Sequence, residues 1–504
     1  MTPQARSVTA SGPASAADPL APYDAVLLLS YGGPEGPDDV LPFMRNATAG
    51  RGVPDSRLRE VSGHYGRWNG VSPINARNAE LLAALRDELA ARGSRVPVVI
   101  GNRNWHPFVS EALRELADAG ARRVLAITTA AYASYSGCRQ YREDVAGAQE
   151  LLADGADGVT GRGWEADAAA RVGGAGGAPV ELVVDKTRPF YNTPGMLAAN
   201  TDAIVAAFNQ LVADGVSADG IRLVLVTHSI PESMERLSAP TAEERAGSGG
   251  AGELSSGAES ADSVGIGPRT VTGRVGEAPE GVVGLAGAPR GTSGADGSRG
   301  GLPSPPSREL GLSAQEPGVA ADLSTEISYV AQHERLAEVL LPAVAARLGR
   351  RPQADLVYCS RSGPPQARWL EPDVNDHLQA LAAGHLTDGR PVDVPTGVVV
   401  APIGFVADHM EVVFDLDTEA RETAEHLGLP YVRAATAGTH PAFVASLADV
   451  LAERAAVARG EDVRPHSTTG TGPFHTVCPP TCCRPATRPA GHPGGSHPQT
   501  TTHQ

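Results

Sequence analysis

The sequence has few aromatic residues, few cysteines, no long apolar runs and no excess of positive charge. Only 4% of its 504 residues are aromatic, and its 5 cysteines are an odd number, which argues against a secreted disulfide framework. The net charge of −16 disfavours a nucleic-acid partner held through its phosphates. No apolar run approaches the ~20 residues of a membrane span, and the N-terminal residues lack the apolar core of a signal peptide. We therefore expect a cytoplasmic protein without a membrane span or a nucleic-acid partner.

Glycine and proline, in contrast, are abundant. The 58 glycines and 41 prolines make up about a fifth of the chain, against roughly 12% in ordinary proteins. Much of this excess lies in a polar tail at residues 1–22, a Gly/Ser/Ala/Pro-rich segment at 238–324 and a Pro/Thr/His-rich segment at 459–504. Such compositions bury too little apolar surface to fold alone, so we expect disorder in the first two segments. A Gly/Ala stretch at 173–179 is a candidate linker.

Between these segments, eight short apolar runs alternate with amphipathic helical patterns. The runs are DAVLLLSYGG, VPVVIGNR, RRVLAITTA, VELVVDK, IRLVLVTHSI, ADLVYCS, TGVVVAPIGF and YVRAAT. Continuous apolar runs of this length predict buried parallel strands, and their alternation with helices predicts an α/β fold with two doubly wound lobes around a cleft. We place the N-terminal lobe at residues 23–178, joined by a C-terminal helix at about 432–458, and the C-terminal lobe at 179–431.

His228 ends one of the predicted strands, in LVLVTHSIPESM. Its imidazole therefore emerges at the carboxyl end of the strand, where ligands of such folds bind. A histidine in that position can accept or donate protons near neutral pH. A histidine that only satisfies a turn carbonyl would give the same pattern.

Three carboxylates follow another strand. Glu411, Asp415 and Glu419 are spaced i, i+4 and i+8, which places them along one helix face. Like charges at this spacing cost roughly 0.2–0.5 kcal/mol per pair. An acidic face turned to solvent is the simpler interpretation. Because the row begins beside Asp408 and His409, directly after an apolar strand, we favour a conduit for a divalent cation that faces the cleft.

Tyr31 ends the first predicted strand and is followed by Gly32 and Gly33. The two glycines allow a flat ligand to approach the backbone closely. A phenol oxygen can also ligate iron. A core tyrosine with a hydrogen-bonded hydroxyl is the other interpretation.

Seven stretches, taken in order along the chain, resemble motifs of the ferrochelatase family, enzymes that insert ferrous iron into porphyrins. They are YGGPEGPDDVLPFMRN, NGVSPINARN, GNRNWHP, VTHSIPESM, SRSGPPQ, WLEPDVNDH and GFVADHMEVVFDLD. The resemblance covers nearly all of the chain from Tyr23 to about Ala458 outside 238–324. It implies two Rossmann-like, chelatase-type lobes around a porphyrin cleft. It also implies a His and a Glu on opposite sides of the macrocycle, at His228 and Glu411.

The chemistry of metal insertion gives these residues distinct roles. A porphyrin must lose two pyrrole N–H protons while a dication sheds its water and enters the ring, so a base and a guiding carboxylate are both needed. The resemblance implies that His228 accepts the pyrrole protons. It implies that Glu411, continued by Asp415 and Glu419, delivers Fe²⁺. We count His228 and Tyr31 among the further groups that contact the metal.

Tyr31 narrows the substrate within this family. SYGGP is similar to members from Gram-positive bacteria, which act on coproporphyrin III, whereas members that act on protoporphyrin often carry Met there. Coproporphyrin III has four propionates, which need cationic and hydroxyl donors; besides Tyr31, the candidates are Arg45, Ser72 and Tyr141. Arg51 is an alternative to Arg45, and solvated surface arginines are the competing interpretation of both. The expected product is Fe-coproporphyrin III (coprohaem).

The cysteine distribution resembles that of actinobacterial ferrochelatases, in which one mid-chain cysteine and three near the C-terminus hold a [2Fe–2S] cluster. The matching residues are Cys138, Cys478, Cys482 and Cys483, and four thiolates suit a two-iron cluster. A zinc ion on the same thiols, or free thiols in an unstructured tail, are the other interpretations. Cys359 is expected to be a thiol near the pocket that binds no metal.

We therefore predict an enzyme of haem synthesis that inserts Fe²⁺ into coproporphyrin III and makes transient contact with neighbouring enzymes of the pathway. Three alternatives stay open. One is a ferrochelatase specific for protoporphyrin IX, and another is a non-catalytic protein that binds tetrapyrroles or haem. The third is a cobalt or nickel chelatase of the same fold.

Overall fold

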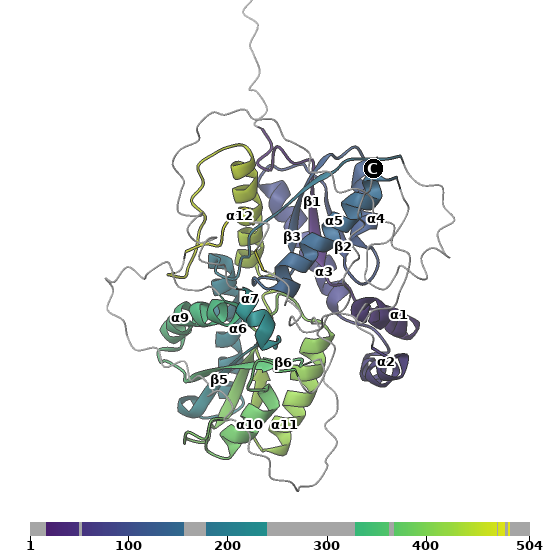
Figure 1. The fold of residues 1–504 in the computed structure, drawn as a ribbon. Helices are drawn as coiled ribbons and strands as arrows, with labels where there is room; N and C mark the ends of the chain where they lie inside the picture. Colours follow the sequence, from purple (N-terminus) through teal and green to yellow (C-terminus); the bar gives the residue numbers. More distant parts are fainter. Residues whose placement is uncertain are drawn as a thin grey trace, which may run out of the picture.

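The computed structural model describes residues 17–49, 53–155, 178–238, 328–361, 367–470, 472–478 and 482–483. These residues form two lobes, each built on a four-stranded parallel sheet with helices on its faces (Figure 1). The predicted α/β fold is therefore confirmed. The predicted segment 238–324 lies outside the described residues apart from Ser238. Among the described helices, none is both long and apolar enough to cross a membrane.

The N-terminal sheet has the strand order β2-β1-β3-β4. Its strands are β1 (Ala25–Ser30), β2 (Val98–Asn102), β3 (Arg123–Thr128) and β4 (Val183–Lys186). One face packs against α3 (Ile74–Ala91), and the other face packs against α4 (Val109–Asp118) and α5 (Gln140–Ala153). Every residue of β1 is buried as a result. A strand covered on both faces needs apolar side chains throughout, which explains its unbroken apolar run.

Strand β4 corrects the predicted boundary between the lobes. The boundary at residue 179 places this strand in the C-terminal lobe, but β4 pairs with β3 of the N-terminal sheet. The chain crosses to the second lobe only at α6 (Pro194–Ala213). The apolar run specifies a strand, whereas the sheet that it joins depends on which edge is open to it.

The C-terminal sheet repeats the same order as β6-β5-β7-β8. Its strands are β5 (Ile221–His228), β6 (Ala354–Cys359), β7 (Gly397–Ala401) and β8 (Tyr431–Arg433). Helices α6 and α9 (Tyr329–Leu348) cover one face. The other face is covered by α10 (Val374–Ala382), η6 (Val412–Ala420) and α11 (Arg421–His426). All eight predicted strands are thus present.

The remaining short elements lie around the cleft or at loop ends. They are α1 (Pro37–Thr48), α2 (Asp55–Ser62), η1 (Gly63–Trp68), η2 (Tyr135–Arg139), η5 (Ala218–Gly220) and α7 (Glu232–Ser238). Helices α1 and α2 and the turn η1 form an apolar cluster with Met410 and Phe414 of the C-terminal lobe. This cluster joins the two lobes beside the cleft.

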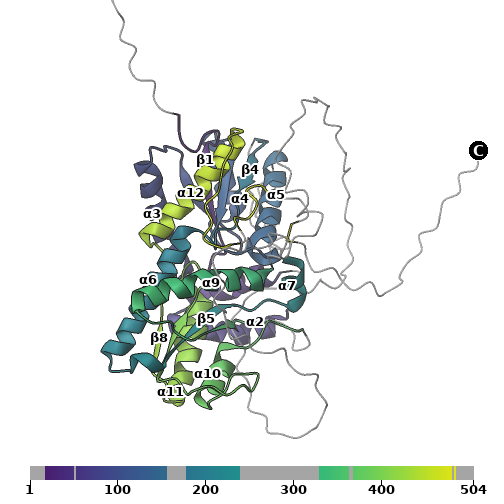
Figure 2. The ribbon, with the colours of Figure 1, turned by 90° about the vertical axis from the view of Figure 1, so that its left-hand side faces the viewer.

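Helix α12 (Pro441–Ala458) carries the chain back to the N-terminal lobe. It packs against α3 and α6, and Figure 2 shows it beside the N-terminal sheet. The described residues that follow are also anchored. Phe474 is buried, and Asn192 donates hydrogen bonds to Ser467 Oγ and the Gly472 carbonyl.

The prediction of a disordered tail at residues 1–22 is wrong for residues 17–22. Leu20 is buried in the same apolar core as β1 and α3. Arg459, after α12, donates to the carbonyls of Pro19 and Ala21 at 3.1 and 2.5 Å. A single leucine in a polar segment is enough to anchor it when a core is open beside it. Residues 1–16 lie outside the described part of the chain.

Candidate functional site

A cavity of about 230 Å³ lies between the lobes and is lined by both. Its walls come from the chain directly after four strands: Tyr31 follows β1, Thr129 follows β3, Ile230 lies beyond β5 and Gly404 beyond β7. These are the two central strands of each sheet, between which the strand order reverses. Crevices of parallel α/β sheets form at this point, beyond the carboxyl ends of the strands.

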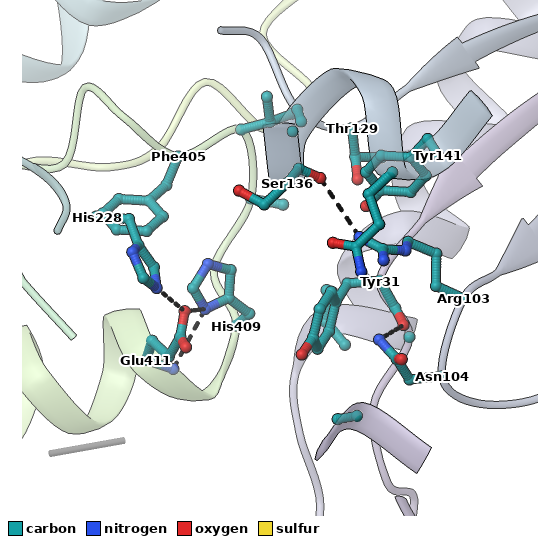
Figure 3. A pocket seen from close by; sticks show the side chains of 18 of the residues that line it. Tyr31, Arg103, Asn104, Thr129, Ser136, Tyr141, His228, Phe405, His409 and Glu411 are labelled. Atoms are coloured by element: carbon teal, nitrogen blue, oxygen red, sulfur yellow. Dashed lines mark hydrogen bonds and ion pairs between the residues drawn. The ribbon is translucent and has the colours of Figure 1, made fainter. Parts of the chain in front are cut away.

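The two walls of the cavity differ in chemistry (Figure 3). The C-terminal lobe contributes His228, Phe405, His409 and Glu411. The N-terminal lobe contributes Tyr31, Arg103, Asn104, Thr129, Ser136 and Tyr141. Groups that can exchange protons near neutral pH therefore face a wall of hydroxyl, amide and guanidinium donors.

His228 is the last residue of β5, so the sheet holds its backbone while its ring extends beyond the strand. Nδ1 is hydrogen-bonded to the carbonyl of Ser229, and because a carbonyl only accepts, Nδ1 carries a proton. Nε2 faces Glu411, whose Oε2 lies 3.6 Å away. This contact does not fit the expectation that the two residues lie on opposite sides of a macrocycle. Both stand on one wall, and Tyr31 stands on the other (Figure 3).

Burial and charge act against each other on this pair. Burial by itself would lower the pKa of His228, but the Glu411 carboxylate outweighs it and the pKa is raised above 6.5. Burial would raise the pKa of Glu411, but His228 and His409 hold it below 4.5. Burial lowers the pKa of His409, whose Nδ1 accepts from the Glu411 backbone N–H at 3.2 Å. These shifts favour an imidazolium–carboxylate pair of His228 and Glu411 beside a neutral His409.

The predicted row of carboxylates begins at Glu411, directly before η6, and continues with Asp415 and Glu419 on η6, which is π-helical rather than α-helical. Asp415 is 3% exposed and accepts a hydrogen bond from Ser360 Oγ. Burial raises the pKa of Asp415 well above its usual range, and the charges of Glu411 and Glu419 add to this effect. These effects favour the protonated form of Asp415, which lies between Glu411 in the cavity and the half-buried Glu419. Short π-helical segments are frequent at functional sites.

Arg103 is the feature of the N-terminal wall that sequence reasoning misses. It directly follows β2, is 7% exposed and forms an ion pair with Asp144 at 2.6 Å. Its guanidinium lies 4.7 Å from the ring centre of Tyr141 and 5.9 Å from that of Tyr31. Among the described residues that line the cavity, it is the only Lys or Arg. The available signal was its position in GNRNWHP, at the carboxyl end of a predicted strand.

Three of the predicted propionate-binding residues line the cavity: Tyr31, Ser72 and Tyr141. Arg45 does not. Its guanidinium pairs with Asp55 at 2.5 Å, and its side chain is 47% exposed. The interpretation as a solvated surface arginine fits this placement. Arg51, the alternative, lies outside the described residues.

The four cysteines predicted as cluster ligands lie together, although Cys138 is far from the others in sequence. The Cys138 thiol is in hydrogen-bonding contact with Cys478 and Cys483. The sulfurs of Cys482 and Cys483 are 3.6 Å apart, and His475 Nε2 lies 3.5 Å from the Cys482 sulfur. Cys483 adopts the left-handed backbone conformation (φ 53°). This turn directs two consecutive thiols into one group.

The surroundings of Cys138 suit anionic sulfur. Hydrogen bonds from Cys478 and Cys483 lower the pKa of Cys138 well below its usual range. Burial alone would lower the pKa of Lys186, at the end of β4, but Cys138 and Cys478 raise it. Lys186 is half-buried, and its ammonium donates to the Thr187 carbonyl at 2.9 Å; a partly desolvated ammonium is stabilised by an anion nearby. Among the described residues, no three His, Cys, Asp or Glu side chains are arranged to hold a metal ion.

Cys359, the fifth cysteine, ends β6 and does not line the cavity. It is 1% exposed, and Ser360 Oγ lies 3.4 Å from its sulfur. Burial raises its pKa well above the usual range. It is therefore a neutral thiol close to Asp415, separate from the group of four.

The fold and the cavity together define a two-lobed α/β protein of the chelatase type. The ferrochelatase family pattern matches residues 23–155 and 289–455. Together these segments make up more than half of the chain. The chain therefore belongs to the ferrochelatase family.

Bacterial relatives are similar to this chain over nearly its whole length. A coproporphyrin III ferrochelatase of Streptomyces griseus is 40% identical over 469 residues, which cover 93% of this chain and 95% of the relative. A coproporphyrin III ferrochelatase of Streptomyces coelicolor is 39% identical over 468 residues, with the same coverage. That of Tropheryma whipplei is 34% identical over 483 residues, covering 95% of this chain and 94% of the relative.

Proposed function

We propose that this enzyme inserts ferrous iron into coproporphyrin III in haem synthesis, forming Fe-coproporphyrin III and releasing two protons. The observation that carries the proposal is the His228–Glu411 pair, which faces Tyr31 and Arg103 across the cavity (Figure 3). The similar Streptomyces proteins are named coproporphyrin III ferrochelatases, which supports the same substrate.

His228 is the proton acceptor in the proposed reaction. At rest it is an imidazolium held by Glu411. A dication that approaches Glu411 offsets the carboxylate charge, so the pKa of His228 falls and Nε2 releases its proton to solvent. Nε2 can then accept a pyrrole proton as metal–nitrogen bonds form. Two such transfers balance the two positive charges that the iron brings to the ring.

Asp415 and Glu419 guide Fe²⁺ to Glu411 in this proposal. Carboxylate oxygens suit a hydrated divalent cation that sheds its water in stages. Glu411 Oε1 and Asp415 Oδ1 are buried and have no hydrogen-bond partner among the described residues, so they are available to the ion. The carboxyl group of Asp415 would release its proton as the cation arrives. The negative charge of Asp415 would then be present only while the cation is nearby. The hydroxyl of Tyr31 completes the metal contacts from the opposite wall.

Arg103 replaces Arg45 in the proposed binding of propionates. Ser72, Tyr141 and Tyr31 supply hydroxyl donors, and Arg103 supplies a guanidinium. Its ion pair with Asp144 and its hydrogen bond to the Ser136 carbonyl orient the guanidinium before substrate arrives. A donor that is already oriented loses little conformational freedom on binding a carboxylate.

We also propose that Cys138, Cys478, Cys482 and Cys483 hold a [2Fe–2S] cluster. The grouping of the thiols, the left-handed turn at Cys483 and the half-buried ammonium of Lys186 support this. When bound, such a cluster supplies one-electron redox chemistry. The four cysteines would contribute the sulfur ligands, and Lys186 would offset part of their negative charge.

The substrate is tested by anaerobic metallation of two porphyrins in one assay. We expect faster turnover of coproporphyrin III than of protoporphyrin IX with Fe²⁺. Equal or faster turnover of protoporphyrin IX would contradict the proposed substrate. Tight porphyrin binding without metallation would instead favour a non-catalytic tetrapyrrole-binding protein, and insertion of Co²⁺ or Ni²⁺ alone would favour the third alternative.

The cluster is tested by the absorption spectrum of the purified protein together with its iron, zinc and acid-labile sulfide content. We expect two irons and two sulfides per chain, as the cluster formula requires. Lys186→Met should lower that content, Lys186→Arg should keep most of it, and Cys359→Ser should leave it unchanged. Zinc in place of iron and sulfide, or no metal in freshly purified protein, would contradict the cluster.

We further propose a cytoplasmic location and transient contact with neighbouring enzymes of haem synthesis. None of the five cysteines is in a disulfide, which suits a reducing compartment. Crosslinking in intact cells, followed by identification of the linked proteins, tests the second part of this proposal.

A further inference from the structure

A buried chain of hydrogen bonds lies behind His228. His333, on α9, is 0% exposed. Its Nδ1 is 2.8 Å from the carbonyl of Tyr329, and its Nε2 is 2.8 Å from Thr227 Oγ1. Thr227 Oγ1 is also 2.8 Å from the Tyr329 hydroxyl, which lies 3.2 Å from the carbonyl of His228. The chain thus links α9 to the backbone at the end of β5.

The direction of each hydrogen bond follows from the groups that make it. The Tyr329 carbonyl can only accept, so Nδ1 of His333 donates to it and carries the ring proton. Burial lowers the pKa of His333 to about 3, so the ring is neutral and Nε2 must accept. Thr227 therefore donates to Nε2. The Tyr329 hydroxyl is then left to donate towards Thr227 Oγ1 and the His228 carbonyl.

Packing holds this network in one arrangement. The His333 ring stacks on Tyr132 with centroids 3.7 Å apart and planes 9° from parallel. Tyr132 belongs to the N-terminal wall of the cavity, and its hydroxyl donates to the Ile403 carbonyl of the other lobe at 2.9 Å. A side chain at Gly404 would place its Cβ 2.1 Å from Thr227 Oγ1. Thr227 is thus confined between His333, Tyr329 and the backbone of Gly404.

A purely structural role does not account for these polar groups. An apolar ring would fill the same space and keep the stack on Tyr132. It would also avoid the free-energy cost of burying a polar imidazole. That cost is higher when the hydrogen bonds of the imidazole are not formed. Fully satisfied buried networks specify one geometry more than they add stability. The geometry specified here is that of Thr227, His228 and Ser229, where His228 bonds its own Nδ1 to the Ser229 carbonyl.

We propose that His333 is a positioning residue for metal insertion, whose neutral ring holds the backbone at the end of β5 so that Nε2 of His228 faces Glu411. His333 does not line the cavity and touches neither reacting group. It acts through Thr227 and Tyr329, and its role rests on the proposed function of His228 as the proton acceptor.

The test uses His333→Phe in the full-length enzyme, since phenylalanine keeps the stack and removes both hydrogen bonds. We expect kcat to fall at least about tenfold, because small misplacements of reacting groups can cost up to about 100-fold. Porphyrin affinity, measured by fluorescence titration, should stay within about threefold of the wild-type value. His333→Asn, which can still donate and accept, should recover part of kcat.

The matched control is His377→Phe in the same lobe. His377 is also 0% exposed and bonds Asp355 at 3.1 Å, away from the cavity. This variant should lose thermal stability and keep kcat. A wild-type kcat in His333→Phe would overturn the proposal. So would a His377→Phe variant that loses kcat, porphyrin affinity and stability in the same proportion as His333→Phe.

The NMR chemical shifts of the His228 ring at one fixed pH separate this proposal from the proposed function. If His333→Phe moves the ring away from Glu411, the shifts of the ring change because the carboxylate no longer lies beside Nε2. This readout needs no substrate, so it remains valid even if the enzyme metallates another porphyrin. Unchanged His228 ring shifts in His333→Phe would overturn the positioning role. Failure of wild-type protein to metallate any porphyrin would overturn the proposed function alone.

Discussion

The two lobes have the same strand order, yet they contribute different chemistry to the cavity. The N-terminal wall presents Tyr31, Ser72, Arg103 and Tyr141, none of which changes charge near neutral pH. The C-terminal wall presents His228 and a row of carboxylates with shifted pKa values. One fold thus serves recognition in one lobe and proton and metal chemistry in the other. The side chains at the strand ends, rather than the fold, determine which of these two roles a lobe has.

The chemical wall also has the more unusual backbone. Glu411 directly precedes the π-helical segment η6, which carries Asp415, and His228 is backed by the buried network of His333. The recognition wall depends on ion pairs and ring contacts around Arg103. Variants of the two walls should therefore fail in different ways: the first in turnover, the second in affinity.

The sharpest test of this division is His228→Ala. Removing the base should lower the rate of metallation by about 10²–10⁴-fold, the usual contribution of a positioned proton acceptor. Porphyrin affinity should change little, because the recognition wall is intact. Anaerobic metallation and fluorescence titration measure the two effects. A wild-type rate of metallation in His228→Ala would contradict the division of roles between the two walls and would favour a non-catalytic porphyrin-binding protein.

Arg103→Leu should give the opposite result. Loss of a charge-assisted hydrogen bond is worth about 1.5–3 kcal/mol, which corresponds to a rise in KM for porphyrin of about 10–100-fold. The value of kcat at saturating porphyrin should be largely retained. The double variant with Asp144→Asn is the control for stability, because Arg103→Leu alone removes the ion pair of the half-buried Asp144 carboxylate. A fall in kcat with unchanged KM would place Arg103 in the chemistry.

Glu411→Gln tests the coupling within the chemical wall. Without the carboxylate, burial still lowers the pKa of His228 and only the Ser229 carbonyl and Asp415 raise it, so the pKa should fall relative to the wild-type protein. The pair should stabilise the wild-type fold between the two folded-state pKa values. This stability is lost as pH rises through the raised pKa of His228, or as it falls through the lowered pKa of Glu411. NMR titration and unfolding at several pH values would measure both; an unchanged pKa of His228 in the variant would refute the coupling.

Arg45→Ala should have the smallest effect. Its pair with Asp55 is exposed, and such pairs contribute about 0–1 kcal/mol to stability. We expect a KM for porphyrin within about threefold of the wild-type value. A rise in KM as large as that in Arg103→Leu would indicate that Arg45 contacts a propionate. The recognition wall would then have a second cation.

Local sequence patterns predicted much of the fold. Each of the eight strands is a short unbroken apolar run, and a strand covered on both faces requires that pattern wherever it lies in the chain. The strand ends also pointed to His228 and Tyr31, because ligands of parallel sheets bind there. The pattern did not reveal that β4 joins the N-terminal sheet, or that Leu20 is anchored in the core.

The sequence by itself determined the elements, the class of fold and the residue types available for proton and metal chemistry, since these depend on neighbours within a few positions. Only the tertiary structure decided that Glu411 contacts His228, that Arg103 rather than Arg45 reaches the cavity, and that Lys186 lies against the thiols. These contacts join segments far apart in the chain. Packing between the lobes determines how deeply these groups are buried and which charges lie beside them. Burial and neighbouring charges in turn determine the pKa values.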